Sequence, residues 1–284
     1  MPTFSLTVDV ARAAAEDVSA ALLEEGASGA EVRDGDGIPM PGVRQPAPDR
    51  ALVVAWFPSR AEAEAAAAGR GGEVEELPDQ DWGEAWKQGL TTLVIGRAFV
   101  RPSWITAAVP AGMVEVVLDP GMAFGTGTHP TTSLCLAALS DLLAARPGAR
   151  VLDVGTGSGL LAIAARKLGA GPVAGSDNDP VAVRVARENA ALNGVELDLN
   201  ERGVGEQRGP FDLVLANILA NTLVELAPAL AAQLAPGGVV LLSGILTPQE
   251  AEVRAAYLAA GLRPLPGGDR RDGEWSLLAM ARAA

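Results

Sequence analysis

The sequence predicts an α/β protein with a doubly wound, mostly parallel sheet flanked by helices, preceded by a small ferredoxin-like α+β domain. From Val151 onward, short apolar runs typical of buried strands alternate with helical patterns, and the first pair is joined by a glycine-rich turn. The first 78 residues instead follow the order β-α-β-β-α-β. We therefore expect a small domain over residues 1–78, a linker over 79–95 and a large domain over 96–284.

The small domain combines alternating and helical patterns. Strands are predicted over residues 3–10, 30–33, 51–57 and 73–77. Helices are predicted over residues 11–25, where Gly26 is a stop signal, and 60–68, where Ser59 is the cap. A glycine- and proline-rich stretch, residues 34–49, predicts a long hairpin loop. Because the candidate strands carry almost no aromatic side chains for stacking on bases, a protein-binding or structural role is favoured over RNA binding.

Composition limits the possible partners and surroundings. The 284 residues are 49% hydrophobic, enough for a sizeable core, and carry a formal net charge of −13. That charge opposes phosphate backbones and favours a basic protein partner, so we expect no direct nucleic-acid binding. No apolar run approaches the ~20 residues that span a bilayer, and the N-terminus lacks a basic segment before an apolar core. We expect a cytoplasmic monomer without membrane contact.

Cysteine and histidine are each present once. Cys135 has no second cysteine with which to form an intrachain disulfide. His129 alone cannot supply the usual His and Cys sets for zinc, so we expect no metal site. A single His could be a general base, but His129 precedes Pro130 at a helix start. This position favours a structural role.

The segment between the domains begins with two tryptophans. Trp82 and Trp86 are spaced i, i+4 and would form one aromatic face of a helix, which favours interdomain packing over substrate contact. Short strands are predicted over residues 93–95, 99–101 and 114–118. They lead into a loop rich in small and hydroxyl residues, followed by a helix from Thr132 to Ala145. This loop, with Phe124 and Thr126, is expected to cover a cofactor.

The large domain is organised around the glycine-rich turn. Val151–Val154 predict a buried strand and Leu160–Leu168 a helix, so Gly155, Gly157 and Gly159 lie where a backbone can approach a ligand closely. The spacing Gly-x-Gly-x-Gly differs from the dinucleotide fingerprint Gly-x-Gly-x-x-Gly, and no Gly-Lys-Ser/Thr follows for a phosphate. The turn therefore indicates a ligand cradle, although a tight connection without a ligand has the same pattern.

A second strand, residues 172–176, ends at Asp177. Asp179 and Pro180 supply an N-cap and a first helical residue for the helix 181–192, which Asn193 and Gly194 close. Asp177 follows the glycines by about 20 residues, where an acidic side chain accepts hydrogen bonds from ribose hydroxyls. The unit predicts a nucleoside site.

The rest of the chain completes the sheet. A buried strand over 211–216 ends at Asn217, either at the edge of the site or as a cap of the next helix. Residues 234–238 predict a turn into a strand over 239–243. Thr247 and Pro248 predict the start of a helix that Gly261 ends, and residues 275–281 predict the last strand.

Together these segments resemble the bacterial ribosomal protein L-eleven (L11) methyltransferases, a family with a Rossmann-like methyltransferase sheet. The similar segments are Asp-Gln-Asp-Trp at 79–82 with Trp-Lys at 86–87, Phe-Gly-Thr-Gly-Thr-His-Pro-Thr-Thr at 124–132, Asp-Val-Gly-Thr-Gly-Ser-Gly at 153–159 and Ala-Asn-Ile-Leu-Ala at 216–220. The resemblance implies transfer of methyl groups from S-adenosylmethionine to lysine ε-amines and the terminal α-amine of large-subunit ribosomal protein L-eleven. Two residues depart from the family pattern: Thr156 stands where cysteine is frequent, and Asn178 where an aliphatic residue is usual.

The resemblance also implies site residues. Its cofactor contacts fall on Thr132, Gly155, Asp177 and Asn217, to which we add Gly157, Phe124 and Thr126. Asn217 would align the acceptor amine with the methyl donor and is the candidate catalytic residue. Because every expected cofactor element lies outside residues 1–78, we expect the small domain to recognise the substrate.

Two alternatives stay open at this point. A methyltransferase of the same fold could act on RNA, a small molecule or another protein. An NAD-dependent oxidoreductase would use the same fold and ribose carboxylate, although the third glycine is misplaced for it.

Overall fold

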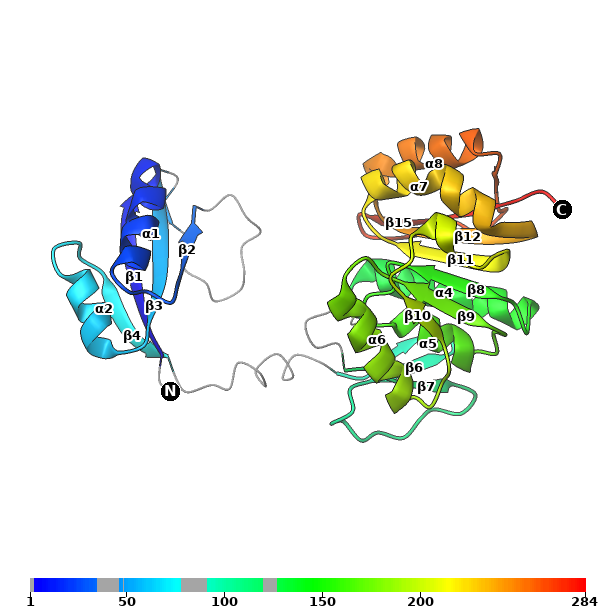
Figure 1. Cartoon of the computed structure of the whole chain (residues 1–284), viewed down its shortest axis with the longest axis horizontal. Coiled ribbons are helices and arrows are strands. Elements are labelled where there is room, and N and C mark those ends of the chain that lie inside the picture. Colours follow the sequence, from blue (N-terminus) through cyan, green and yellow to red (C-terminus); the bar gives the residue numbers. More distant parts are fainter. Residues whose placement is uncertain (1–2, 35–45, 48, 78–90, 120–126) are drawn as a thin grey trace. The chain divides into compact units, whose positions relative to one another are not determined.

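The computed structural model describes residues 3–34, 46–47, 49–77, 91–119 and 127–284. The chain divides into two compact units, Met1–Gly89 and Leu90–Ala284, each with its own hydrophobic core (Figure 1). Phe124, Thr126, Trp82, Trp86 and most of the expected hairpin loop 34–49 lie outside the described residues.

The first unit has the expected ferredoxin-like topology. Its elements are β1 (Thr3–Ala11), α1 (Ala15–Glu24), β2 (Gly29–Arg33), β3 (Arg50–Phe57), α2 (Arg60–Ala67) and β4 (Glu73–Leu77). The antiparallel sheet has the order β2-β3-β1-β4. Ser59 caps α2 as predicted, by accepting a hydrogen bond from the Glu62 N–H. The helix predicted from residue 11 begins later, because Ala11 still pairs with Arg50 in the sheet and a 3₁₀ turn over Arg12–Ala14 follows.

The second unit contains the predicted doubly wound sheet. Its strands are β8 (Val151–Val154), β9 (Val173–Ser176), β10 (Asp198–Asn200), β11 (Phe211–Asn217), β12 (Leu234–Leu246), β13 (Arg263–Pro264), β14 (Arg270–Asp272) and β15 (Trp275–Ala281). The order is β10-β9-β8-β11-β12-β15-β13, with β14 beside β15. Strands β8 to β12 pair in parallel, and β15 is antiparallel to β12. The winding direction reverses between β8 and β11, where ligands bind at the carboxyl ends of the strands in such sheets.

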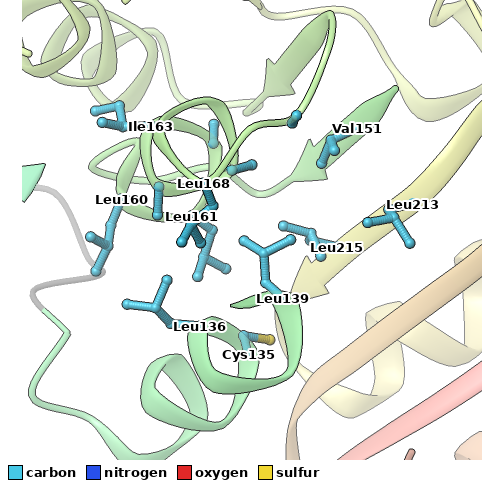
Figure 2. Packing of buried hydrophobic residues seen from close by; sticks show 14 of the residues in the cluster. Cys135, Leu136, Leu139, Val151, Leu160, Leu161, Ile163, Leu168, Leu213 and Leu215 are labelled. Carbon is cyan, nitrogen blue, oxygen red and sulfur yellow. The ribbon is translucent and has the colours of Figure 1, made fainter. Parts of the chain in front are cut away.

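Helices cover both faces of this sheet. One face packs against α4 (Pro130–Ala145), α5 (Leu160–Lys167) and α6 (Pro180–Leu192). The other packs against α7 (Ala220–Gln233) and α8 (Glu250–Ala259), which also contact each other (Figure 1). Figure 2 shows the first core, in which apolar side chains of α4 and α5 pack against those of β8 and β11. Alternate residues of the central strands enter opposite cores, so the sheet is buried on both faces.

A separate sheet precedes α4. It has the order β5 (Leu93–Ile95), β6 (Ala98–Arg101) and β7 (Val114–Val117). The predicted linker, residues 79–95, includes Leu93–Ile95, but this segment pairs with β6 and so belongs to the sheet. No helix in the described part of the chain is both long and apolar enough to cross a membrane.

Two predicted boundaries near the C-terminus are wrong. The expected turn over 234–238 lies inside β12, because Leu234 already pairs with Phe211 before a register shift. Thr247 does not cap a helix, since its hydroxyl donates to the Glu274 carbonyl. A 3₁₀ turn over Thr247–Gln249 precedes α8 instead, and the Gln249 side chain accepts from the Leu246 N–H.

Candidate active site

The glycine-rich turn connects β8 to α5 at the carboxyl edge of the sheet. Gly155, Gly157 and Gly159 all have positive φ, at 69°, 54° and 84°. A Cβ on Gly155 would lie 2.4 Å from Cγ2 of Ile218, which follows β11. Glycine is therefore required at residue 155 both for the backbone angle and for the close approach of the neighbouring segment.

Asp177 holds the turn from the end of β9. Its Oδ2 accepts a hydrogen bond from the Gly157 N–H at 2.9 Å, and its Oδ1 accepts one from the Asp179 N–H at 3.1 Å. Asp179 caps α6 through the Val181 N–H, as predicted. The structure thus brings Asp177 and the glycine turn together.

A cavity of about 230 Å³ opens beside these residues. Its wall is formed by the ends of β8 and β9, the segment after β10 and the start of α7. The lining residues are Val154, Gly155, Ser176, Asp177, Asn178, Glu201, Arg202, Gly203, Val204, Ile218, Thr222 and Leu226. A partly apolar hollow with a carboxylate at a strand end fits a nucleoside, whose base is planar and whose ribose carries hydroxyl donors.

Asp153 lies beneath the turn, and sequence reasoning missed it as a site residue. It is 1% exposed, and its Oδ2 accepts a hydrogen bond of 2.7 Å from the Thr156 hydroxyl. Burial raises the pKa of the Asp153 carboxyl to about 6. Thr156, which stands where cysteine is frequent in the family, therefore has a structural role, because its hydroxyl donates a hydrogen bond to the buried Asp153 carboxyl.

Asn217 is the last residue of β11, where it pairs with Ser243 of β12. Its Nδ2 donates a hydrogen bond of 3.2 Å to Oγ1 of Thr132, in the first turn of α4. Asn217 is not a helix cap, because Leu219 occupies the N-cap position of α7. The structure therefore joins two of the predicted site residues across the sheet edge.

The start of α4 is fastened on several sides. His129 is its N-cap, and Nδ1 lies 2.8 Å from the hydroxyl oxygen of Thr131. The imidazole ring also packs edge-to-face on Trp275, with ring centroids 4.8 Å apart. The Ser243 hydroxyl donates to the Thr131 carbonyl at 3.1 Å. These contacts support the structural role predicted for His129, since they fix the turn that carries Thr132.

Comparison with known proteins shows the family of this chain. A family model described as ribosomal protein L11 methyltransferase (PrmA) matches residues 2–283. The chain belongs to the ribosomal protein L11 methyltransferase family. The ribosomal protein L11 methyltransferase of Myxococcus xanthus is 47% identical to it over 98% of both chains. That of Geobacter sulfurreducens is 53% identical over 71% of this chain and 66% of its own.

A solved member of the family resembles the structure. The crystal structure of a ribosomal protein L11 methylase from Lactobacillus delbrueckii subsp. bulgaricus is 36% identical, with a TM-score of 0.60. The alignment covers 66% of this chain and 96% of that chain. The resemblance seen in the sequence motifs is therefore confirmed, and with it the L11 methyltransferase fold.

Some site residues were missed because nothing local marks them. Ser243 lies inside an apolar strand, yet it fastens α4. Asn189 lies inside α6 and is 1% exposed, although asparagine is mostly a surface residue, and its side chain donates a hydrogen bond to the Ser158 carbonyl in the glycine-rich turn. The only signal for Asp153 was a carboxylate within a buried strand, which requires a partner.

Proposed function

We propose that this protein transfers methyl groups from S-adenosylmethionine to lysine ε-amines and the terminal α-amine of ribosomal protein L11. The observation that carries the proposal is the hydrogen bond between Asn217 and Thr132 at the sheet edge next to the glycine turn. Membership of the ribosomal protein L11 methyltransferase family supports the substrate and the reaction.

We place S-adenosylmethionine in the cavity beside the turn, and two features of its wall support this. Gly155 has no room for a side chain, and the partly exposed Asp177 carboxylate stands in the cavity wall. Asp177 would accept hydrogen bonds from the ribose hydroxyls, while Gly155 would let the ligand lie against the backbone. Once bound, the cofactor supplies an electrophilic methyl group on a sulfonium.

The acceptor amine needs alignment more than activation by a strong base. A free lysine has a pKa near 10.4, so the site must favour the neutral amine and direct its lone pair. The Asn217 Nδ2 donates its hydrogen bond to Thr132. The Asn217 side-chain carbonyl oxygen is therefore the group that would accept a hydrogen bond from the amine N–H. Asn217 would therefore orient the amine and hold one of its protons while the nitrogen attacks the methyl group.

The substrate-binding function is assigned to the small domain. Acidic residues outnumber basic ones there by 14 to 6 within residues 1–78, which favours a lysine-rich partner. The unit has its own core, whereas the residues that line the cofactor cavity belong to the second unit. Deleting the small domain should leave S-adenosylmethionine affinity near normal but abolish methylation of intact L11. Full-rate methylation by the truncated, folded enzyme would show that this assignment is wrong.

Transfer of label tests the function itself. The enzyme and labelled S-adenosylmethionine are added to an extract that contains L11, RNA and small molecules, and the labelled fraction is identified. Label in L11 supports the proposal, and label in RNA or a small molecule instead would replace it with another acceptor. Binding of S-adenosylmethionine but not NAD, measured by calorimetry, excludes the oxidoreductase alternative.

A further inference from the structure

A buried asparagine on α6 connects two distant parts of the second unit. The Asn189 Oδ1 accepts a hydrogen bond of 2.9 Å from the backbone N–H of Asp119, just after β7. The Asn189 Nδ2 donates one of 2.9 Å to the backbone carbonyl of Ser158, inside the glycine-rich turn. One amide thus ties the segment after the three-stranded sheet to the turn.

The hydrogen bond from Asn189 is made to the Ser158–Gly159 peptide, whose carbonyl and N–H groups are both hydrogen-bonded. The Ser158 carbonyl accepts from Asn189, while the N–H of the next residue, Gly159, donates to the Thr156 carbonyl at 2.9 Å. One turn earlier on α6, Ala186 packs so closely that a Cβ on Gly159 would lie 3.1 Å from its methyl carbon. The orientation of this peptide therefore depends on α6.

That orientation matters for the neighbouring residues of the turn. Gly157, directly before Ser158, donates its N–H to Asp177 in the cavity wall. Two residues before Gly157 lies Gly155, which approaches Ile218 so closely that a Cβ would clash with it. We expect a rotation of the Ser158–Gly159 peptide to displace the Gly157 contact with Asp177, because Ser158 directly follows Gly157.

We propose that Asn189 is a positioning residue for the cofactor, holding the Ser158–Gly159 peptide so that the turn keeps the shape that S-adenosylmethionine binds. The inference rests on the proposed function for the identity of the cofactor. Replacing Asn189 leaves the buried Ser158 carbonyl without its hydrogen-bond donor, which costs free energy. We expect the Ser158–Gly159 peptide to rotate in the variant, because rotation lowers this cost.

The same helix offers a matched control. Asn193, one turn after Asn189, accepts a hydrogen bond of 2.9 Å from the Val117 N–H and donates one of 2.6 Å to the Val117 carbonyl. It fastens α6 to β7, and its other donor bond goes to the Asn189 carbonyl within the helix. Loss of Asn193 therefore removes the bracing of β7 and leaves the bond from Asn189 to the Ser158 carbonyl in place.

The experiment compares Asn189→Leu and Asn189→Ala with Asn193→Leu and Asn193→Ala in the full-length chain. Thermal unfolding gives stability, calorimetry gives the Kd for S-adenosylmethionine, and initial rates with L11 give KM and kcat. We expect a lower Tm for every variant. The Asn189 variants should bind S-adenosylmethionine about tenfold more weakly, the effect of ~1.4 kcal/mol, with kcat little changed at saturation. The Asn193 variants should bind it within about twofold of wild type.

Two results would overturn the inference: wild-type affinity in the Asn189 variants, or equal loss of affinity in the Asn193 variants. If the leucine variants do not fold, the alanine pair decides, because the smaller side chain leaves space for water. A wild-type protein that binds no S-adenosylmethionine would instead contradict the proposed function and this inference with it.

Discussion

Replacing Gly155 by alanine should damage the site through two separable effects. At φ +69° an L-residue in the left-handed region costs about 1–2 kcal/mol. The new Cβ would also lie 2.4 Å from Ile218 Cγ2, and such overpacking costs a further ~1–3 kcal/mol. We expect Gly155→Ala to lower the free energy of unfolding by about 2–5 kcal/mol in total. The substitution should also weaken S-adenosylmethionine binding, because Gly155 and Ile218 both line the cavity.

Gly194→Ala is the matched control for this change. Gly194 has φ +63°, and no described atom lies within 4 Å of the position that its Cβ would occupy, so only the backbone cost applies. Denaturant unfolding gives the difference between the two variants. Adding Ile218→Ala to Gly155→Ala removes the clashing methyl and should recover part of the loss in a double-mutant cycle. Equal destabilisation by Gly155→Ala and Gly194→Ala, or no recovery of stability on adding Ile218→Ala, would contradict a clash at Ile218.

Three further predictions concern four substitutions in and beside the site. Asp177→Ala should weaken S-adenosylmethionine binding by about 1.5–3 kcal/mol, the scale of lost hydrogen bonds to a charged acceptor, and unchanged affinity in calorimetry would remove Asp177 from the site. Asn217→Ala should lower kcat more than it raises KM, whereas the rate of His129→Ala should fall by less than the roughly 10²- to 10⁴-fold expected for loss of a general base. Single-turnover rates of both variants are measured across a range of pH. An almost inactive His129→Ala variant beside an active Asn217→Ala variant would contradict this prediction. Because burial raises the pKa of Asp153 from 3.8 to about 6, protonation stabilises the native state fully below pH 3.8 and this stabilisation is lost as pH rises through about 6. Asp153→Asn should remove this dependence, on the order of 3 kcal/mol, and unfolding curves in which both proteins respond equally to pH would refute it.

The elements predicted well are those with local signals at both ends. For α6, Asp179 and Pro180 mark the start and Gly194 the end, and the helix spans Pro180–Leu192. The places of Asp177 and Asn217 were also predictable, because Asp177 directly follows the buried strand β9 and Asn217 is the last residue of β11. In these segments the chain's own chemistry fixes the boundary.

The elements missed depend on distant partners. The strands β10, β13 and β14 have three residues or fewer and exist only because a longer strand pairs with them. Asn189 and Ser243 gain their importance from carbonyls that lie 31 and 112 residues away in sequence. Single-sequence periodicity contains no information about such contacts.

The mass of purified L11 after incubation with this enzyme and S-adenosylmethionine decides whether L11 is the methyl acceptor. We expect the L11 mass to rise in steps of one methyl group, with the added groups mapped by fragmentation to lysine side chains and the terminal amine. The Asn217→Ala variant should give a much slower rise under the same conditions. An unchanged L11 mass, with an enzyme that binds both S-adenosylmethionine and L11, would contradict the proposed function.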